Sequence, residues 1–452
     1  MLQLLKKIIS AKNGRNIFPR WYRLVFYSVL FSLALGMRIP WLWEIPRYVD
    51  ELKEVNLARL IYLGKLYPLH NMAREIGAFH NYILAGIFKI FGLSLAWPRL
   101  YVAIISALTV VLIYELGRRL YNRSTGLIAA GLLLTNGMHI LVTHTAWSNC
   151  TTPFFFILGF MTVLTAEQNR NGKGLIIAGF VWALALQTHS SVIIYLVVII
   201  GYVLRMYRSG DSDSDSDSDS KIETKYYIYA GLAFITGYAN MIYYNTLSRG
   251  GSIAWIFSKD YTLETNPGWN SFLKNLHSMF FEVIRSLSAV YASRGPLLGE
   301  YLAQPLFAAC IFILGLGIVR AVKKRQWLLL WLIGAGFMVI PWINRRYGFF
   351  MVTRYIMPVI ICSILLLADG LYALYELISA KLGRPRLAVI VGVSLFLGFT
   401  GFQLGQFYYY CAKLSDTDMS NRLAIRIVRI IAKWDPVSNT KVIDRLEGYL
   451  GK

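Results

Sequence analysis

The apolar stretch YRLVFYSVLFSLALGM (22–37) is followed, after a polar interval, by DELKEVNLARLIY (50–62). The first stretch approaches the roughly twenty apolar residues that a membrane-spanning helix needs. In the second, apolar residues recur every three or four positions among charged ones, which predicts an amphipathic helix in the membrane interface. This helix begins with two adjacent carboxylates, Asp50 and Glu51. Their position ahead of many further apolar runs indicates chemistry on a lipid-borne substrate.

The composition predicts an integral membrane protein. The chain has 452 residues, of which 56% are hydrophobic and only 15% charged. Its apolar runs predict an all-α polytopic membrane protein with about 11 (9–13) transmembrane helices. The predicted spans are residues 22–37, 97–117, 126–143, 153–166, 175–188, 191–204, 226–245, 301–322, 327–343, 355–378 and 387–406, and a short apolar helix is expected at 79–92.

The net charge of +22 comes from Lys and Arg residues that lie between the apolar runs. This distribution orients a protein in a membrane, so it argues against a nucleic-acid partner. By the positive-inside rule the basic loops and the N-terminus are cytoplasmic. The loop that carries Asp50 and Glu51 is therefore the first exoplasmic loop, and its helix is a juxtamembrane helix. The basic loops lie at 118–123, 170–173, 205–225, 320–325 and 381–386.

We expect one transmembrane domain over residues 1–407 and a short exoplasmic C-terminal tail over 408–452. Within the domain, residues 38–78 form the first exoplasmic loop and residues 246–300 another. Residues 209–221 contain an alternating Asp/Ser tract. The tract matches the Asp-x-Asp pattern of nucleotide-sugar transferases, but a repetitive segment without hydrophobic residues cannot fold around a metal-phosphate pocket. It is expected to be a disordered cytoplasmic linker.

Asp50 and Glu51 are the candidate catalytic residues. A carboxylate fixed at the start of a helix can accept a proton from a reacting hydroxyl. The alternative is structural: Asp50 as a helix N-cap, with Glu51 complementing the helix dipole. The two interpretations are compatible, because a capping carboxylate is also well placed to react.

Cations near the same predicted face are candidates for binding a donor phosphate. Arg345, Arg346 and Arg354 lie within ten residues where positive charge is normally sparse. A guanidinium group offers paired donors that suit phosphate. Lys89 lies in an apolar sequence, where an unpaired ammonium is costly. For each of these residues the alternative is an anchor whose charge reaches the interface.

Three further residues are weaker candidates for contacting the sugar or the acceptor: His80, His144 and Tyr67. The histidines have no paired spacing typical of a zinc site, and a lone histidine is more often a packing residue. Aromatic side chains such as Tyr67 can stack on sugar rings. A divalent metal ion shared by Glu51 and His80 is conceivable, but no spacing supports a definite cofactor.

The chain resembles the GT-C membrane glycosyltransferases, a broad family that includes protein O-mannosyltransferases and aminoarabinose lipid A transferases. The resemblance implies an inverting enzyme that moves a sugar from a polyprenyl-phosphate carrier to a lipid, glycan or protein acceptor at the exoplasmic face. Asp50 would be the catalytic carboxylate, and Glu51 would support the loop or a metal. The chain departs from the family at 77–81, where many relatives have a proline-rich stretch. The matching residues are Arg38, Asp50-Glu51, Ala58, Gly64, Tyr67-Pro68, Phe91-Gly92, Arg99-Leu100, Tyr114 to Leu120 and, more weakly, Arg354-Tyr355 and Pro358.

Three alternatives compete with this interpretation. A lipid or sugar transporter would also carry charges in its spans, but the chain shows no convincing internal repeat. A lipid-linked polysaccharide polymerase or ligase would use a large exoplasmic loop, for which 246–300 is available. A non-catalytic membrane scaffold would use Asp50 and Glu51 only as a helix cap.

Overall fold

The computed structural model describes residues 20–43, 45, 49–212, 222–256, 269–289, 299–343, 350–383 and 385–415. Within these ranges the chain is helical, and its one β-type contact is an isolated bridge between His70 and Gly77. The helices are α2 (Arg20–Gly36), α3 (Val49–Tyr62), α4 (Phe79–Phe91), α5 (Ala96–Leu120), α6 (Arg123–Leu134), α7 (Gly137–Val142), η1 (Ser148–Thr151), α8 (Thr152–Gln168), α9 (Gly172–Thr188), α10 (Val192–Ser212), α11 (Thr224–Gly237), α12 (Ala239–Leu247), α13 (Gly251–Ile256), α15 (Trp269–Ser288), α16 (Gly299–Lys323), α17 (Trp327–Ile343), α18 (Phe350–Leu382) and α19 (Pro385–Ser415).

The all-α polytopic class predicted from the sequence is confirmed. In the described ranges, five helical segments are long and apolar enough to cross a membrane, and four shorter apolar helices accompany them. The predicted number of eleven transmembrane helices is therefore approximate. The five are Ala96–Leu120, Ser148–Gln168, Gln304–Lys323, Arg354–Lys381 and Val389–Tyr408, and the shorter ones are Trp21–Gly36, Arg123–Leu134, Gly172–Thr188 and Trp327–Ile343.

Two predicted spans are broken in the structure. The stretch 126–143 divides into α6 and α7, because the Asn136 side chain accepts a hydrogen bond from His139 N and so caps a new helix. The stretch 226–245 divides into α11 and α12 at Gly237, whose carbonyl accepts a hydrogen bond from Gln187. Apolar content alone gave no sign of these interruptions.

Helices are present in three regions for which the sequence predicts a linker, a tail or a loop. Helix α10 continues to Ser212, so the first residues of the predicted 209–221 linker are helical. The rest of that tract lies outside the described residues. Helix α19 continues to Ser415, so the predicted tail 408–452 begins as a helix, and residues 416–452 lie outside the description. The predicted loop 246–300 contains α13 and the twenty-residue helix α15.

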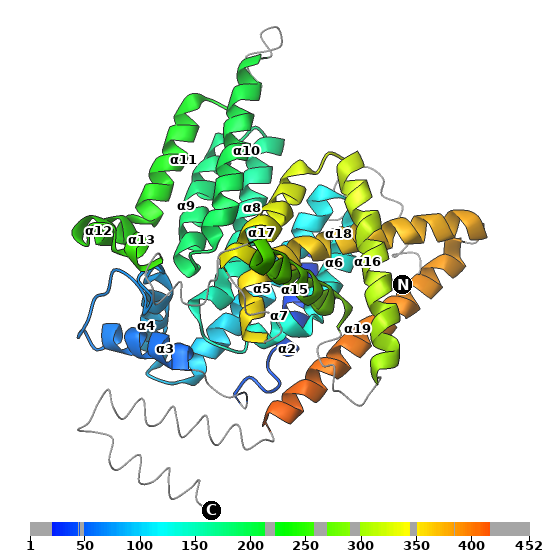
Figure 1. Cartoon of the computed structure of the whole chain (residues 1–452), viewed down its shortest axis with the longest axis horizontal. Helices are drawn as coiled ribbons and strands as arrows, with labels where there is room; N and C mark the ends of the chain where they lie inside the picture. The colour runs from blue at the N-terminus through cyan, green and yellow to red at the C-terminus, as the bar shows by residue number, and fades with distance from the viewer. Residues whose placement is uncertain are drawn as a thin grey trace, which may run out of the picture.

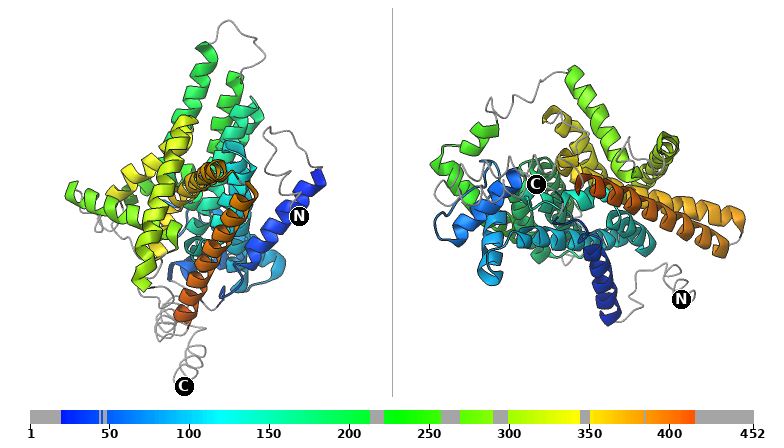
Figure 2. Two further views of the ribbon diagram at one scale, coloured as in Figure 1. Left: turned by 90° about the vertical axis from the view of Figure 1, so that its right-hand side faces the viewer. Right: turned by 90° about the horizontal axis from the view of Figure 1, so that it is seen from below.

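The longer helices run between two opposite ends of the helix bundle. Helix α5 has 25 residues, and at 1.5 Å per residue it is about 37 Å long, enough to cross the apolar core of a bilayer. Its first turn carries Arg99, and its last turn carries Arg118 and Arg119. Helices α3 and α4 lie at the lower end of the molecule, away from the upper ends of α10 and α11 (Figures 1 and 2).

Candidate active site

Helix α3 packs against α4, and the three carboxylates of α3 differ in burial. Glu51, Glu54, Val55 and Ala58 are buried at the spacing of one helical face. Asp50 is partly exposed at the start of the helix. The helix predicted at 50–62 is present. Its buried face carries two carboxylates, Glu51 and Glu54, beside the apolar residues.

Glu51 forms a buried ion pair with Arg99. Arg99 Nε lies 2.7 Å from Glu51 Oε1, and Arg99 Nη2 lies 2.9 Å from Glu51 Oε2, with both side chains fully buried. Arg99 Nη1 also donates to the carbonyls of Leu42 and Ile45, at 2.8 and 2.7 Å. The pair therefore fixes the first loop against α5, and both oxygens of Glu51 are engaged.

Asp50 differs from its neighbour. Among the described residues its carboxylate forms no hydrogen bond or ion pair, and it is only partly buried. It lies one helical turn before Glu54, and its charge acts on the Glu54 carboxyl. The next residue, Glu51, is fixed to α5 and so holds Asp50 in place. Because the Asp50 carboxylate has no partner among the described residues, it is available to accept a proton.

Glu54 joins helix α3 to the turn before α8. Its Oε2 accepts a hydrogen bond from Ser148 N at 2.8 Å, and its Oε1 accepts one from Ser148 Oγ at 3.1 Å. The Asn71 side chain is a further donor to this carboxyl. Burial raises the pKa of Glu54 to about 7, against the opposing effect of these hydrogen bonds. Sequence reasoning missed this residue. Its spacing from Glu51 and Ala58 was the available signal.

Arg354, at the start of α18, reaches the same turn. Its guanidinium carbon lies 4.0 Å from the centre of the Trp147 ring and 4.5 Å from that of Tyr355. Its Nη2 lies 2.5 Å from Tyr355 Oη, and its buried Nε has no hydrogen-bond partner among the described residues. No carboxylate in the described part of the chain pairs with it. The site thus contains a stacked cation without a counter-ion.

The charge of Arg354 reaches two further residues of the site. Burial, reinforced by this guanidinium, lowers the pKa of His189 to about 3. The His189 ring lies 4.8 Å from the Tyr355 ring. Cys150 lies within the electrostatic range of both Arg354 and Glu54. Residues from α3, η1, the end of α9 and α18 therefore converge at one place, which no sequence spacing indicated.

Two predicted histidines are packed against backbone. His80 Nε2 lies 3.3 Å from the Ala146 carbonyl, whereas its buried Nδ1 has no partner in the described chain. Both ring nitrogens of His144 face carbonyls, those of Ile140 and Pro40, at 2.6 and 2.9 Å. Burial lowers the pKa of each histidine to about 4, so both rings are neutral near pH 7. His80 borders the site, and His144 has no nitrogen left for a ligand.

The other predicted residues are not brought to the site by any described contact. Tyr67 is 69% exposed and lies near Gly64 and Tyr82. Lys89 is exposed in the last turn of α4, at the opposite end of that helix from His80. Arg345 and Arg346 lie outside the described residues.

Arg38, one of the residues on which the family resemblance rests, is fully buried. Its Nη1 donates to the Ala34 carbonyl of α2 at 2.8 Å, as a cap would. Its Nε also contacts Ser106 Oγ at 2.5 Å, and its Nη2 lies 3.0 Å from His139 Nδ1. Because a guanidinium can only donate, His139 Nδ1 must accept, and the His139 proton lies on Nε2. This contact joins α2, α5 and α7 beneath the first loop.

No metal site is apparent in the described segments, where no group of three or more His, Cys, Asp or Glu side chains is arranged to hold an ion. Glu51 and His80, which had been considered as shared ligands, have other contacts. The Glu51 oxygens bind Arg99, and His80 Nε2 faces a carbonyl.

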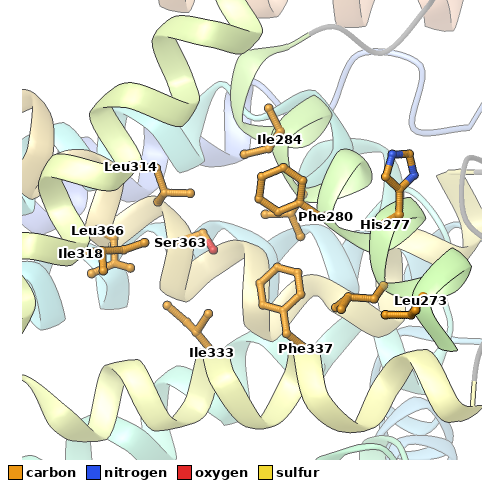
Figure 3. Close-up of a pocket in the computed structure, with 12 residues that line it drawn as sticks. Leu273, His277, Phe280, Ile284, Leu314, Ile318, Ile333, Phe337, Ser363 and Leu366 are labelled. Atoms are coloured by element: carbon orange, nitrogen blue, oxygen red, sulfur yellow. The ribbon is translucent and has the colours of Figure 1, made fainter. Parts of the chain in front are cut away.

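An apolar groove of about 560 Å³ lies between α15, α16, α17 and α18. Figure 3 shows Phe280, Ile284, Leu314 and Phe337 around it, with the Ser363 hydroxyl on the α18 side. Ser363 is nine residues beyond Arg354 on α18, or about 14 Å along the helix.

The fold and part of the sequence match known proteins. Residues 77–209 match the family of dolichyl-phosphate-mannose-protein mannosyltransferases. The structure is similar to that of ArnT from Cupriavidus metallidurans bound to undecaprenyl phosphate, with a TM-score of 0.58 and 12% identity over 92% of this chain and 81% of ArnT. The chain has the GT-C fold of membrane glycosyltransferases. The resemblance inferred from the sequence is confirmed at this level.

A second similarity is more distant. The archaeal oligosaccharyltransferase AglB from Archaeoglobus fulgidus, in complex with an inhibitory peptide and a dolichol-phosphate, matches with a TM-score of 0.51 and 14% identity. The match covers 96% of this chain but only 60% of AglB, so the chain spans about three fifths of that protein's length. No curated protein matches the chain by sequence.

Proposed function

We propose that this GT-C protein transfers a sugar, with inversion, from a polyprenyl-phosphate carrier to an acceptor at the exoplasmic face of the membrane. The observation that carries the proposal is that a carboxylate, Asp50, and a cation, Arg354, lie at the same end of the helix bundle, where neither has an oppositely charged partner among the described residues. The fold supports the same reaction class, because the similar proteins ArnT and AglB were captured with undecaprenyl phosphate and a dolichol-phosphate.

The reaction needs a base for the acceptor. As the acceptor hydroxyl attacks the anomeric carbon, its oxygen forms the new glycosidic bond and its proton passes to Asp50. The bond between the anomeric carbon and the phosphate oxygen breaks, and its electron pair leaves with the lipid phosphate. Proton acceptance by a positioned carboxylate is typically worth about 10²–10⁴ in rate. Glu51 takes no proton, because the ion pair with Arg99 keeps it engaged.

The leaving group needs a cation. Negative charge develops on the phosphate oxygen as the bond breaks, and a fixed positive group close to it lowers the barrier. Arg354 suits this role because its Nε has no partner among the described residues and Trp147 stacks on its guanidinium group. We assign the donor phosphate to Arg354. Lys89 is assigned no part, because it is exposed at the far end of α4.

The distribution of charge supports an exoplasmic location of the site. The end of the bundle opposite the site carries the basic loops with Arg118, Arg119, Arg320 and Lys324. Cytoplasmic loops are enriched in such residues. The site would then be out of reach of cytosolic nucleotides, and a lipid-linked donor is the kind of donor available there.

The test is transfer by the purified protein in lipid vesicles. Lipid that copurifies with the protein is first identified by mass spectrometry, and a glycosylated polyprenyl phosphate is expected. That lipid is then supplied as donor, and the anomeric configuration of the product is determined. A product of inverted configuration supports the proposal. A protein that moves the lipid across the bilayer without cleaving it would be a transporter, and the proposal would be wrong.

A further inference from the structure

Glu54 occupies a position between the two groups assigned to the reaction. It follows Asp50 by one helical turn, and its carboxyl accepts hydrogen bonds from the backbone N and the hydroxyl of Ser148. It is 4% exposed, and no Lys, Arg or His in the described chain pairs with it. A buried carboxyl without a counter-ion is costly to maintain, so its retention calls for an explanation.

The residue before Ser148 contacts Arg354, the cation of the site. Trp147 precedes Ser148, and its ring supports the Arg354 guanidinium at 4.0 Å. Glu54 of α3 therefore holds Ser148 by hydrogen bonds, and the neighbouring residue Trp147 stacks on Arg354 of α18. Asn71 strengthens the same connection, because its Nδ2 donates to Ser148 Oγ at 3.3 Å.

We propose that Glu54 is a positioning residue that sets the placement of Arg354 relative to Asp50 through the Ser148–Trp147 turn. This inference rests on the proposed function, since it takes Asp50 as the base and Arg354 as the phosphate ligand. Glu54 itself touches neither the donor nor the acceptor. Its carboxylate form is the effective one, because all three of its described partners are hydrogen-bond donors.

The groups around Glu54 make its ionisation observable near neutral pH. Asp50 is the like charge on its own helix, and Arg354 and Cys150 lie beyond the turn. His80 and His189 border the site, but burial lowers their pKa to about 4 and about 3, so they do not titrate between pH 6 and 8. Burial raises the pKa of Glu54 to about 7. Its hydrogen-bonded carboxylate form is therefore lost as the pH falls through that value.

The sign of the stability effect separates positioning from a merely structural role. The pKa of Glu54 is higher in the folded protein than the usual carboxyl value, so the ionised side chain destabilises the fold above pH 7. Glu54→Gln removes that charge while keeping the shape of the side chain. We expect the variant to unfold at the same or a higher temperature than wild type at pH 8.5. A purely structural hydrogen bond would give a lower unfolding temperature.

The experiment measures binding of undecaprenyl phosphate to the protein in nanodiscs from pH 6 to pH 8. In wild type we expect affinity to rise with pH more steeply than in Glu54→Gln, and the variant to bind about tenfold more weakly at pH 8, the size expected for lost hydrogen bonds to a charged group. Comparing the two proteins removes the titration of the lipid phosphate itself. Glu75→Gln is the matched control, because Glu75 is also a buried carboxyl of the first loop, 6% exposed, with a pKa raised by burial.

The double variant Glu54→Gln/Arg354→Lys tests the connection directly. Because Glu54 is proposed to act through Arg354, the combined loss of affinity should be clearly smaller than the sum of the two single losses. Additive losses, or equal pH dependence in wild type and Glu54→Gln, would overturn the inference. Should Glu54→Gln fail to fold, Ser148→Ala must weaken binding, and unchanged binding would overturn it equally. If wild type does not bind the lipid at all, the proposed function fails first, and this inference falls with it.

Discussion

The two ends of the helix bundle differ in whether their charged side chains have oppositely charged partners. At the end with the basic loops, Asp369 of α18 is fully buried but lies 2.9 Å from Arg320 and 3.0 Å from Lys324. Glu115 of α5 likewise binds both Arg118 and Arg119. At the opposite end, Asp50, Glu54 and Arg354 have no oppositely charged partner in the described structure, and only Glu51 is paired.

The contrast separates charges that hold the fold from charges that await a ligand. Removing a charge from water costs several kcal/mol unless a counter-ion or several hydrogen bonds compensate, so proteins rarely leave such groups unpaired by accident. The pairs of Asp369 link α18 to Arg320 of α16 and to Lys324 directly after that helix, whereas the pairs of Glu115 lie within α5. Under the proposed function, the donor phosphate would neutralise Arg354 and the acceptor proton would neutralise Asp50, whereas Glu54 would only position Arg354. The comparison therefore predicts opposite results for stability and activity at the two ends.

The largest effect is expected at Asp50. Asp50→Asn should reduce the transfer rate by about 10²–10⁴, the contribution typical of a positioned base, while the variant inserts and binds the donor normally. Steady-state transfer in vesicles measures the rate, and donor binding is the control. Turnover close to that of wild type would show that the base is another group. The lack of a charged partner at Asp50 would then not indicate a catalytic role.

Glu51 and Arg99 form the exception at the site end, and breaking their pair tests whether it is structural. Arg99→Met leaves a buried carboxylate without a partner and should lower the free energy of unfolding by about 3–5 kcal/mol. Chemical unfolding in detergent measures this value. In the double variant Arg99→Met/Glu51→Leu no charge remains buried, so most of the stability should return. A double variant as unstable as the single one would contradict the ion-pair interpretation.

At Arg354 we expect activity and stability to separate. Arg354→Ala should raise the KM for the donor about 10–100-fold, since a hydrogen bond to a charged group is typically worth about 1.5–3 kcal/mol. The KM for the acceptor and the unfolding temperature should change little, because no protein carboxylate loses a partner. Arg354→Lys retains the charge but not the planar fork, so an intermediate KM is expected. Equal rises in the KM for donor and acceptor would count against a phosphate role.

Sequence reasoning reached the unpaired charges more easily than their surroundings. Asp50 could be predicted because it starts a helix after a span, and Arg354 because a cation is unexpected on that side. Glu54 was not predicted, because in the sequence it is one of several polar residues in the stretch 50–62. The face that packs on α4 is fixed by tertiary contacts rather than by residue type. Trp147 and His189 meet Arg354 across more than 160 positions of the chain, and no local pattern encodes such a contact.

The breaks in predicted spans have the same origin. Asn136 and Gly237 interrupt apolar stretches through a side-chain cap and through a hydrogen bond from Gln187. Hydropathy registers neither interaction, because each depends on one polar atom within an apolar run. The helical class and the position of the first loop agree with the structure, because both follow from composition over many residues. The site depends on single contacts, so it required the structure.

The smallest effect is expected at the basic end, where the partners of Asp369 are themselves partly exposed. Arg320 is 25% and Lys324 35% exposed, so water can compensate them when the carboxylate is removed. Asp369→Asn should therefore lower the free energy of unfolding by about 1–2 kcal/mol and leave the transfer rate per folded molecule unchanged. Glu376→Gln is the control, because Glu376 binds Arg320 from a 46% exposed position and should change neither quantity. If Asp369→Asn instead abolished transfer while the protein stayed folded, the two ends would be coupled, and charge pairing would no longer distinguish the framework of this protein from its site.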